Sequence, residues 1–270
     1  MRAAPGCSVQ DGGRPGRLAA GLPPSGPLDA AAHAAANLAV GNAPDAASIE
    51  VPLGALTVCA RSDMRVSIDG EPPVALAAGA TLEVPACARA VRYLAVAGGI
   101  DVPIVLGARA TLVVAGVGGH EGRALRSGDV LALARATSDN DEDAPRRGAV
   151  TPPDPDDPAA LRVSAGPHLL HLPPQAFDVF LGSTWVVSQL GDRVGVRLEG
   201  AKVPRAPARD LAGPVPLVRG AVQVSTDGAP IVLGPDHPVT GGYPVIAVVH
   251  AAAQALLARV RPGGRVRFVL

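Results

Sequence analysis

The amino-acid sequence predicts a mainly β protein of two domains with a few short helices. Its 270 residues are enough for two domains of ordinary size. The 32 glycines and 28 prolines separate many short valine-rich runs, a spacing typical of strands in barrels or sandwiches rather than of alternating strands and helices. A six-residue echo, SIDGEP at 67–72 and STDGAP at 225–230, indicates that the two domains are built alike.

The charge and cysteine content narrow the class of partner. There are 24 basic and 24 acidic residues, so the formal charge is +0, and we expect a small molecule or another protein rather than nucleic acid or an acidic membrane. Cys7, Cys59 and Cys87 are too few and too scattered for a disulfide framework or a four-ligand metal site. With no signal-peptide core and no apolar run of membrane length, the sequence predicts a cytoplasmic protein.

The opening segment, residues 8–29, is too rich in glycine and proline for a regular helix or a long strand. Gln10, Asp11 and Arg14 lie in it, and an aspartate and an arginine this close in sequence can brace each other across a glycine-rich loop. We therefore expect a structured loop, with a solvated tail as the alternative.

One helix and a series of strands follow. Residues 27–40 begin with a proline suited to a first helical turn, are rich in alanine and are closed by Gly41 and Asn42, which predicts a helix. His33 within it is expected to pack or to face solvent rather than to bind a ligand. Short β-type runs between turns predict strands at residues 49–51, 56–59, 66–68, 74–76, 81–84, 93–96 and 111–114.

A change of composition marks the domain boundary. Residues 136–158 contain almost no large apolar residue and are crowded with aspartate and proline. We predict an interdomain linker over residues 136–160, between a first domain at 1–135 and a second at 161–270.

The second domain opens with a predicted strand at 161–163 and a predicted short helix running into a strand at 177–185. His168 and His171 can share one helical face, but no third ligand lies near them in sequence, so we expect no metal site.

Charged residues crowd a predicted strand within residues 191–200, GDRVGVRLEG. A structural ion pair between Asp192 and Arg193 is the default interpretation. The alternative is that these residues and Arg197 anchor an anion or a carboxylate.

Residues 220–244 combine a hairpin with a polar glycine-rich loop. Two apolar runs at 221–224 and 231–233 flank Asp227 and Gly228, which supply the positive φ of a reversing turn. The following Thr240, Gly241, Gly242 and Tyr243 let the backbone approach a ligand at two successive glycines, with a hydroxyl on either side. A bend that serves only packing is the alternative.

Seven collinear motifs carry a family resemblance: SVQDGGRPGR, SGPLD, ANLAVGN, YLAVAGGIDVP, DRVGVRLEG, GAVQVSTDGAPIVL and TGGYP. In this order the chain resembles the family of the 5-oxoprolinase C subunit, also called biotin-dependent carboxyltransferase or allophanate hydrolase subunit 2 proteins. The resemblance implies two cyclophilin-like β-barrel domains. It also implies a hydrolase subunit, inactive alone, that works with the B and A subunits to open 5-oxoproline to glutamate with ATP.

Two other roles follow from the same resemblance. One is a biotin-dependent carboxyltransferase subunit acting on a urea-like acceptor, and the other is a non-catalytic regulatory binding protein. The chain has no Gly-Lys-Ser/Thr phosphate loop and no Met-Lys biotin site, so ATP contacts are expected from other subunits and biotin from a separate carrier.

The resemblance also directs attention to particular residues. An amide-opening enzyme must hold the amide oxygen and its developing charge, for which we select Gln223, Thr240, Gly241, Gly242 and Tyr243. The expected substrate-binding residues are Gln10, Asp11, Arg14, Asp192, Arg193 and Arg197. The chain departs from the family pattern at Val196, Val239 and Val245, where tyrosine, threonine and lysine are usual.

Overall fold

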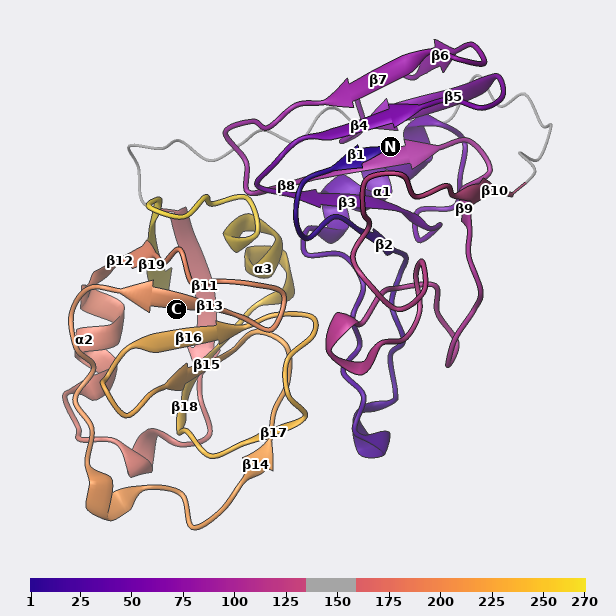
Figure 1. Cartoon of the computed structure of the whole chain (residues 1–270). Coiled ribbons are helices and arrows are strands. Elements are labelled where there is room, and N and C mark those ends of the chain that lie inside the picture. The colour runs from indigo at the N-terminus through magenta and orange to yellow at the C-terminus, as the bar shows by residue number, and fades with distance from the viewer. Residues whose placement is uncertain (135–158) are drawn as a thin grey trace. The chain divides into compact units, whose positions relative to one another are not determined.

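The computed structural model of the chain describes residues 1–134 and 159–270. They divide into two compact units (Figure 1). The first contains Met1–Arg14 and the described residues from Ser25 to 134, and the second contains Pro15–Pro24 and residues 159–270. The mainly β prediction is confirmed. The predicted linker at 136–160 lies almost entirely outside the described residues, and its boundaries stay a prediction.

The first unit is built from antiparallel sheets. Its largest sheet has five strands in the order β2-β3-β8-β5-β6, namely Ser8–Gln10, Ser48–Pro52, Val91–Val96, Met64–Ile68 and Val74–Leu76. A three-stranded sheet joins β1, β4 and β7 (Arg2–Ala3, Leu56–Cys59 and Thr81–Val84). A short pair joins β9 and β10 (Ile100–Asp101 and Ala132–Leu133). None of these sheets closes into a barrel. Among the described residues, a closed barrel is found in the second unit.

The two faces of the five-stranded sheet differ in polarity because side chains alternate along each strand. Ile49 and Leu94 are opposite each other on one face and belong to the apolar core of the unit. Glu50 and Tyr93 are opposite each other on the other face, where both are fully buried. Helix α1 (Ala30–Ala39) packs on that second face.

Helix α1 begins later than the predicted start at residue 27. The Asp29 carboxylate accepts hydrogen bonds from the backbone N–H groups of Ala31 and Ala32, each at 3.1 Å. Such an N-cap satisfies two of the donors that a helix start leaves free. Asp29, rather than the preceding proline, therefore sets the first turn.

The predicted strand at 111–114 is wrong. Only Thr111 and Leu112 make strand-like contacts, through a hydrogen bond from Thr111 N to Val9 O and a bridge between Leu112 and Val117. Val113–Ala115 forms a 3₁₀ turn that ends at Gly116 with φ of 65°. The chain reverses there because glycine adopts this left-handed conformation readily.

The second unit is a closed barrel of seven strands in the order β11-β18-β15-β16-β13-β12-β19. Their bounds are Ala159–Ala165, Val245–Val249, Ala221–Val224, Pro230–Leu233, Gly195–Glu199, Thr184–Val187 and Arg265–Val269. All neighbours are antiparallel except β11 and β19. The barrel confirms the predicted strands at 161–163, 221–224 and 231–233.

Two short helices and an aromatic cluster complete this unit. Helix α2 (Ala176–Gly182) runs into β12, as predicted, and α3 (Ala251–Leu257) follows β18. The rings of Phe180 and Phe268 stack at 4.3 Å between centroids, and Trp185 Nε1 donates to the carbonyl of Phe180 at 3.1 Å. No helix among the described residues is long and apolar enough to cross a membrane.

The six-residue echo corresponds to one side-chain contact that occurs in both units. Ser67 Oγ donates to the carbonyl of Glu71 at 2.7 Å, and Ser225 Oγ donates to the carbonyl of Ala229 at 2.8 Å. Each hydroxyl therefore closes a turn on the residue four positions further along. The two units share this local device although their sheets differ.

Candidate functional site

The candidate site lies on the outer face of the barrel. In register across three strands, Arg197 is opposite Ile231, and Ile231 is opposite Gln223. Residues that are directly opposite in an antiparallel ladder project from the same face. The alternate positions, including Val222 and Val232, are buried in the barrel core, so Arg197 and Gln223 project outward.

A small ribbon covers this outer face. It pairs β14 (Val215–Pro216) with β17 (Thr240–Gly241). Beneath it lies a separate apolar cluster of Leu217, Ala221, Leu233 and Val245. The ladder between β15 and β18 shifts register between Val222 and Gln223, an irregularity of the kind that re-aims a side chain. Apolar contact thus holds the glycine-rich loop over the strand that carries Gln223.

Gln223 connects the strand to the loop. Its side chain is only 6% exposed, and its Nε2 donates to the carbonyl of Tyr243 at 3.3 Å. A β-carbon on Gly241 would lie 2.9 Å from Gln223 Nε2 and 2.7 Å from Leu217 Cδ1. Glycine at 241 is therefore required for the loop to pack this closely.

Gly242 differs from its neighbour. It is exposed, and a β-carbon there would meet no atom within 4 Å. Neither Gly241 nor Gly242 has a left-handed φ. Gly241 is therefore packed against the protein, while Gly242 faces open space. The expected approach of a ligand to both glycines stays a prediction.

Polar groups of the loop point to solvent. Thr240 is exposed and Tyr243 is 37% exposed, and neither hydroxyl bonds to another group in the described part of the chain. Within the same ranges the N–H of Gly242 donates to no protein group. Two hydroxyls and one amide are thus available to a ligand beside the Gln223 amide.

The expected ion pair between Asp192 and Arg193 is wrong. Arg193 instead pairs with Asp236 through two contacts, Nε to Oδ2 at 2.8 Å and Nη2 to Oδ1 at 3.2 Å. Asp192 accepts from the backbone N–H groups of Val194 and Gly195 at 2.8 and 3.1 Å. The arginine therefore ties the loop before β13 to the loop before β17, with its charge balanced by Asp236.

Arg197 retains more freedom. Its side chain is 39% exposed and its Nη1 lies 3.9 Å from Asp227 Oδ1, while Asp227 Oδ2 pairs with Lys202 Nζ at 3.2 Å. The Ser225 hydroxyl and Lys202 lower the pKa of Asp227 to about 2, so this carboxylate stays charged at neutral pH. At 3.9 Å in solvent the pairing is weak, so Arg197 is able to contact an anionic group.

Two of the three valines that depart from the family pattern are apolar packing residues here. Val245 is buried beneath the ribbon, and Val196 packs against the barrel core. Val239 uses its backbone carbonyl to accept a hydrogen bond from Leu217 N at 2.9 Å. Valine at 245 therefore keeps the cluster beneath the ribbon apolar, where a lysine would add a charge.

The predicted residues of the opening loop lie in the first unit. Asp11 accepts from three backbone N–H groups, those of Gly13, Arg109 and Ala110, at 2.9, 2.5 and 3.1 Å. Arg14 is fully buried and donates through Nη2 to the carbonyl of Ala110 at 2.5 Å. The two side chains brace residues 109–110 rather than each other, which corrects the expected contact. A structured loop is confirmed.

Gln10 is fully buried in the same region. Its Nε2 donates to Ser8 Oγ at 3.0 Å and to the carbonyl of Thr111 at 3.2 Å. These bonds give Gln10, Asp11 and Arg14 a clear part in holding the first unit together. Any contact of theirs with substrate stays a prediction.

A buried polar layer beneath helix α1 was not expected from the sequence. The Tyr93 hydroxyl donates to Glu50 at 2.7 Å and accepts from the backbone N–H of Asp29 at 2.9 Å. His33 Nε2 lies 3.3 Å from the carbonyl of Gln10. Burial raises the pKa of Tyr93 and lowers that of His33, so both are neutral near pH 7. The alternation of polar and apolar residues at Ser48, Ile49 and Glu50 is the sequence pattern that indicates a polar face on this strand.

The paired histidines make hydrogen bonds within the protein. His168 Nδ1 accepts from the N–H of Val245 at 3.1 Å, and His171 Nδ1 donates to the carbonyl of Arg209 at 2.7 Å. In the described ranges, no group of three or more histidines, cysteines and carboxylates is arranged to hold a metal ion.

Known proteins share this architecture. The family model "Carboxyltransferase domain, subdomain A and B" matches residues 20–270. The C subunit of 5-oxoprolinase from Escherichia coli is 35% identical over 284 residues, covering 100% of this chain and 89% of that protein. Urea amidolyase of Lachancea kluyveri is 32% identical over 97% of this chain, which spans only 16% of that protein.

A solved structure agrees. That of the Kluyveromyces lactis urea carboxylase superposes with a TM-score of 0.90 at 27% identity, covering 100% of this chain and 27% of that one. With the barrel, the outer-face loop and the motif order, these similarities establish that the chain belongs to the carboxyltransferase-domain family that includes the C subunit of 5-oxoprolinase.

Proposed function

We propose that the chain is the C subunit of an ATP-dependent 5-oxoprolinase, which opens 5-oxoproline to glutamate together with the A and B subunits. One observation favours 5-oxoprolinase over the other activities found in the family. The similarity to the Escherichia coli 5-oxoprolinase C subunit extends over the whole chain and 89% of that protein, whereas the chain spans only 16% of the urea amidolyase.

The outer face of the barrel has groups that suit a lactam. A lactam edge presents one carbonyl acceptor and one N–H donor. The Gln223 amide has both complementary functions, and the Gly242 N–H with the Thr240 and Tyr243 hydroxyls adds donors for an oxygen that gains negative charge. We assign to these groups the task of orienting the ring and holding its oxygen.

ATP, when bound in the complex, would supply the phosphoryl group that activates the amide carbonyl toward water, so that the ring nitrogen leaves with a proton and phosphate is released. The hydrogen-bond donors of this chain suit the amide oxygen, which gains negative charge in that reaction. Arg197 is an exposed cation on the same face, because Arg197 and Gln223 are both opposite Ile231 in the sheet. The sequence offers no phosphate-binding loop, so we assign the nucleotide contacts to the other subunits.

A biotin-dependent carboxyltransferase is the second candidate, favoured by the family model and by the likeness to urea carboxylase. A ureido group presents the same carbonyl and N–H pattern as a lactam, so the donor set of the outer face fits it equally. Lys202, the one lysine of the chain, pairs with Asp227 and does not follow a methionine, so biotin would arrive on a separate carrier. A purely regulatory binding role is the third candidate, consistent with the apolar packing of Val196 and Val245.

The proposal is tested by reconstitution. The purified chain should release no glutamate from 5-oxoproline and ATP by itself, and should support release when mixed with the A and B subunits. ATP-dependent glutamate release by the isolated chain would contradict the proposed division of labour. Turnover of urea with carboxylated biotin, in the absence of 5-oxoproline opening, would favour the second candidate.

A further inference from the structure

The first unit contains a cavity of 570 Å³ that the proposed function does not use. Its floor is the apolar face of the five-stranded sheet, opposite the face that packs on α1, and includes Ile49, Val66 and Leu94. Leu131 and Leu133 contribute a wall. Cavities of roughly 300–1,000 Å³ with mostly apolar walls are typical of small-molecule sites.

The composition of this unit explains why the space is open. Tyr93 is the one aromatic residue among residues 1–134, and it points to the opposite face of the sheet. No aromatic ring lines the cavity, and Met64 adds a flexible thioether that can adapt to a bound molecule.

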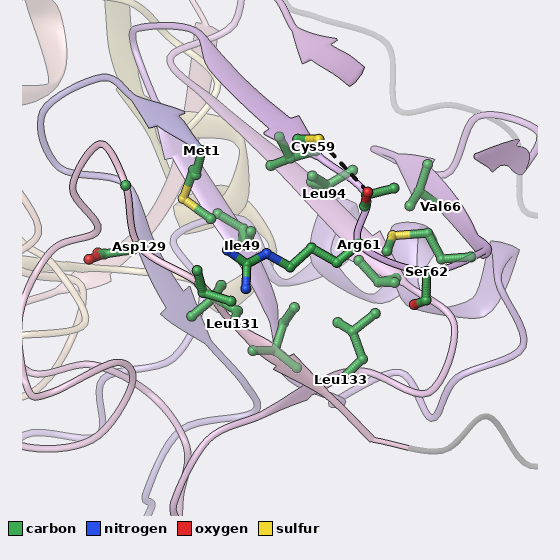
Figure 2. A pocket seen from close by; sticks show the side chains of 17 residues that line it. Met1, Ile49, Cys59, Arg61, Ser62, Val66, Leu94, Asp129, Leu131 and Leu133 are labelled. Carbon is green, nitrogen blue, oxygen red and sulfur yellow. Dashed lines mark hydrogen bonds between the residues drawn. The ribbon is translucent and has the colours of Figure 1, made fainter. Parts of the chain in front are cut away.

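One cation reaches into the cavity. Figure 2 shows the Arg61 side chain extended into the space between the labelled aliphatic residues, while the Asp129 carboxylate points away from it. Asp129 pairs with Arg123 at 2.7 Å and accepts from the N–H of Arg126 at 2.7 Å. In residues 1–134 and 159–270 no carboxylate lies within ion-pair distance of Arg61.

We propose that this cavity binds an aliphatic monocarboxylate, with its tail on the sheet face and its carboxylate on the Arg61 guanidinium. A guanidinium matches the two oxygens of a carboxylate with two parallel N–H donors. The cavity lining has one cation that points inward. A single positive charge suits a monoanion better than a phosphate dianion. The site belongs wholly to the first unit, so it is independent of the lactam chemistry assigned to the barrel.

Isothermal titration of the full chain with decanoate tests the proposal, with decanol as the uncharged probe. We expect saturable binding of decanoate with a negative heat-capacity change, because apolar surface is buried. Arg61→Gln should weaken decanoate binding about two- to fivefold, as expected for loss of an exposed ion pair. Its affinity for decanol should not change. Arg65→Gln is the matched control, because Arg65 lies between Met64 and Val66 on β5 and projects from the opposite face.

A second variant tests the location. Val58→Phe places a ring in the cavity from its partly exposed wall, so it should abolish binding of both probes while the protein still melts cooperatively. Absence of decanoate binding to the wild type would overturn the proposal. So would equal decanoate affinity in the wild type and Arg61→Gln, or undiminished binding in Val58→Phe.

Discussion

Replacing Gly242 by alanine separates contact with a ligand from packing within the protein. The added β-carbon meets no atom within 4 Å, and the residue does not have a left-handed φ. Gly242→Ala should therefore leave folding unchanged or stabilise it slightly, by up to about 1 kcal/mol through a less flexible unfolded chain. If a substrate oxygen binds the Gly242 N–H, the methyl group obstructs that approach.

The expected size of the effect follows from that role. Loss of one oxyanion donor costs about 10²–10³ in rate, or about 2.7–4 kcal/mol, and an obstructed donor should fall near the lower end. The assay is ATP-dependent glutamate release by the complex reconstituted from the variant with the A and B subunits. Melting temperature and binding to those subunits are measured on the same preparation.

Gly241→Ala is the matched variant. Its β-carbon would lie 2.7 Å from Leu217 Cδ1 and 2.9 Å from Gln223 Nε2, so we expect overpacking that costs about 1–3 kcal/mol and a lower melting temperature. Full activity of Gly242→Ala, with unchanged binding to its partner subunits, would contradict a substrate contact at the Gly242 N–H. A much lower melting temperature of Gly242→Ala with retained activity per folded molecule would contradict it as well.

Three further predictions concern the first unit. Asp11→Ala should lower the free energy of unfolding by about 2–4 kcal/mol, because three backbone N–H groups lose their acceptor, and unchanged urea denaturation would contradict the bracing role. Burial lowers the pKa of His33 in the folded protein below its usual value of 6.5. The contribution of the neutral His33 to the free energy of unfolding is therefore complete above about pH 6.5. As the pH falls from there toward the folded-state pKa, this contribution is lost at up to about 1.4 kcal/mol per pH unit. His33→Gln should flatten that part of the stability profile, and an unaltered slope would contradict the assignment. Burial raises the pKa of Cys7 to about 11, so at pH 8 a thiol reagent should modify the exposed Cys59 and leave Cys7 until the protein unfolds; early labelling of Cys7 would disagree.

Local patterns predicted elements well where turns follow closely. The strands at 56–59, 74–76 and 81–84 are observed with the same bounds, because each apolar run is bounded by turn residues. The strand predicted at 111–114 failed because the 3₁₀ turn Val113–Ala115 starts immediately after Leu112 and ends at Gly116. Valine content alone does not distinguish a strand from a 3₁₀ turn that exposes its side chains.

Contacts between residues far apart in the sequence could not be predicted from local patterns. Arg193 pairs with Asp236, 43 residues away, although Asp192 is its neighbour in sequence. Tyr93 and Glu50 meet only because their strands are adjacent in the sheet. The different surroundings of Gly241 and Gly242 likewise depend on the ribbon that packs on the barrel, which no spacing of glycines specifies.

The most direct measurement compares two substrates with one preparation of the reconstituted complex. Glutamate release from 5-oxoproline and carboxylation of urea are followed in parallel, with ATP present and this chain either included or omitted. We predict glutamate release that depends on the chain, and no carboxylation of urea even when carboxylated biotin is supplied. Equal glutamate release with and without the chain, or carboxylation of urea alone, would contradict the proposed function.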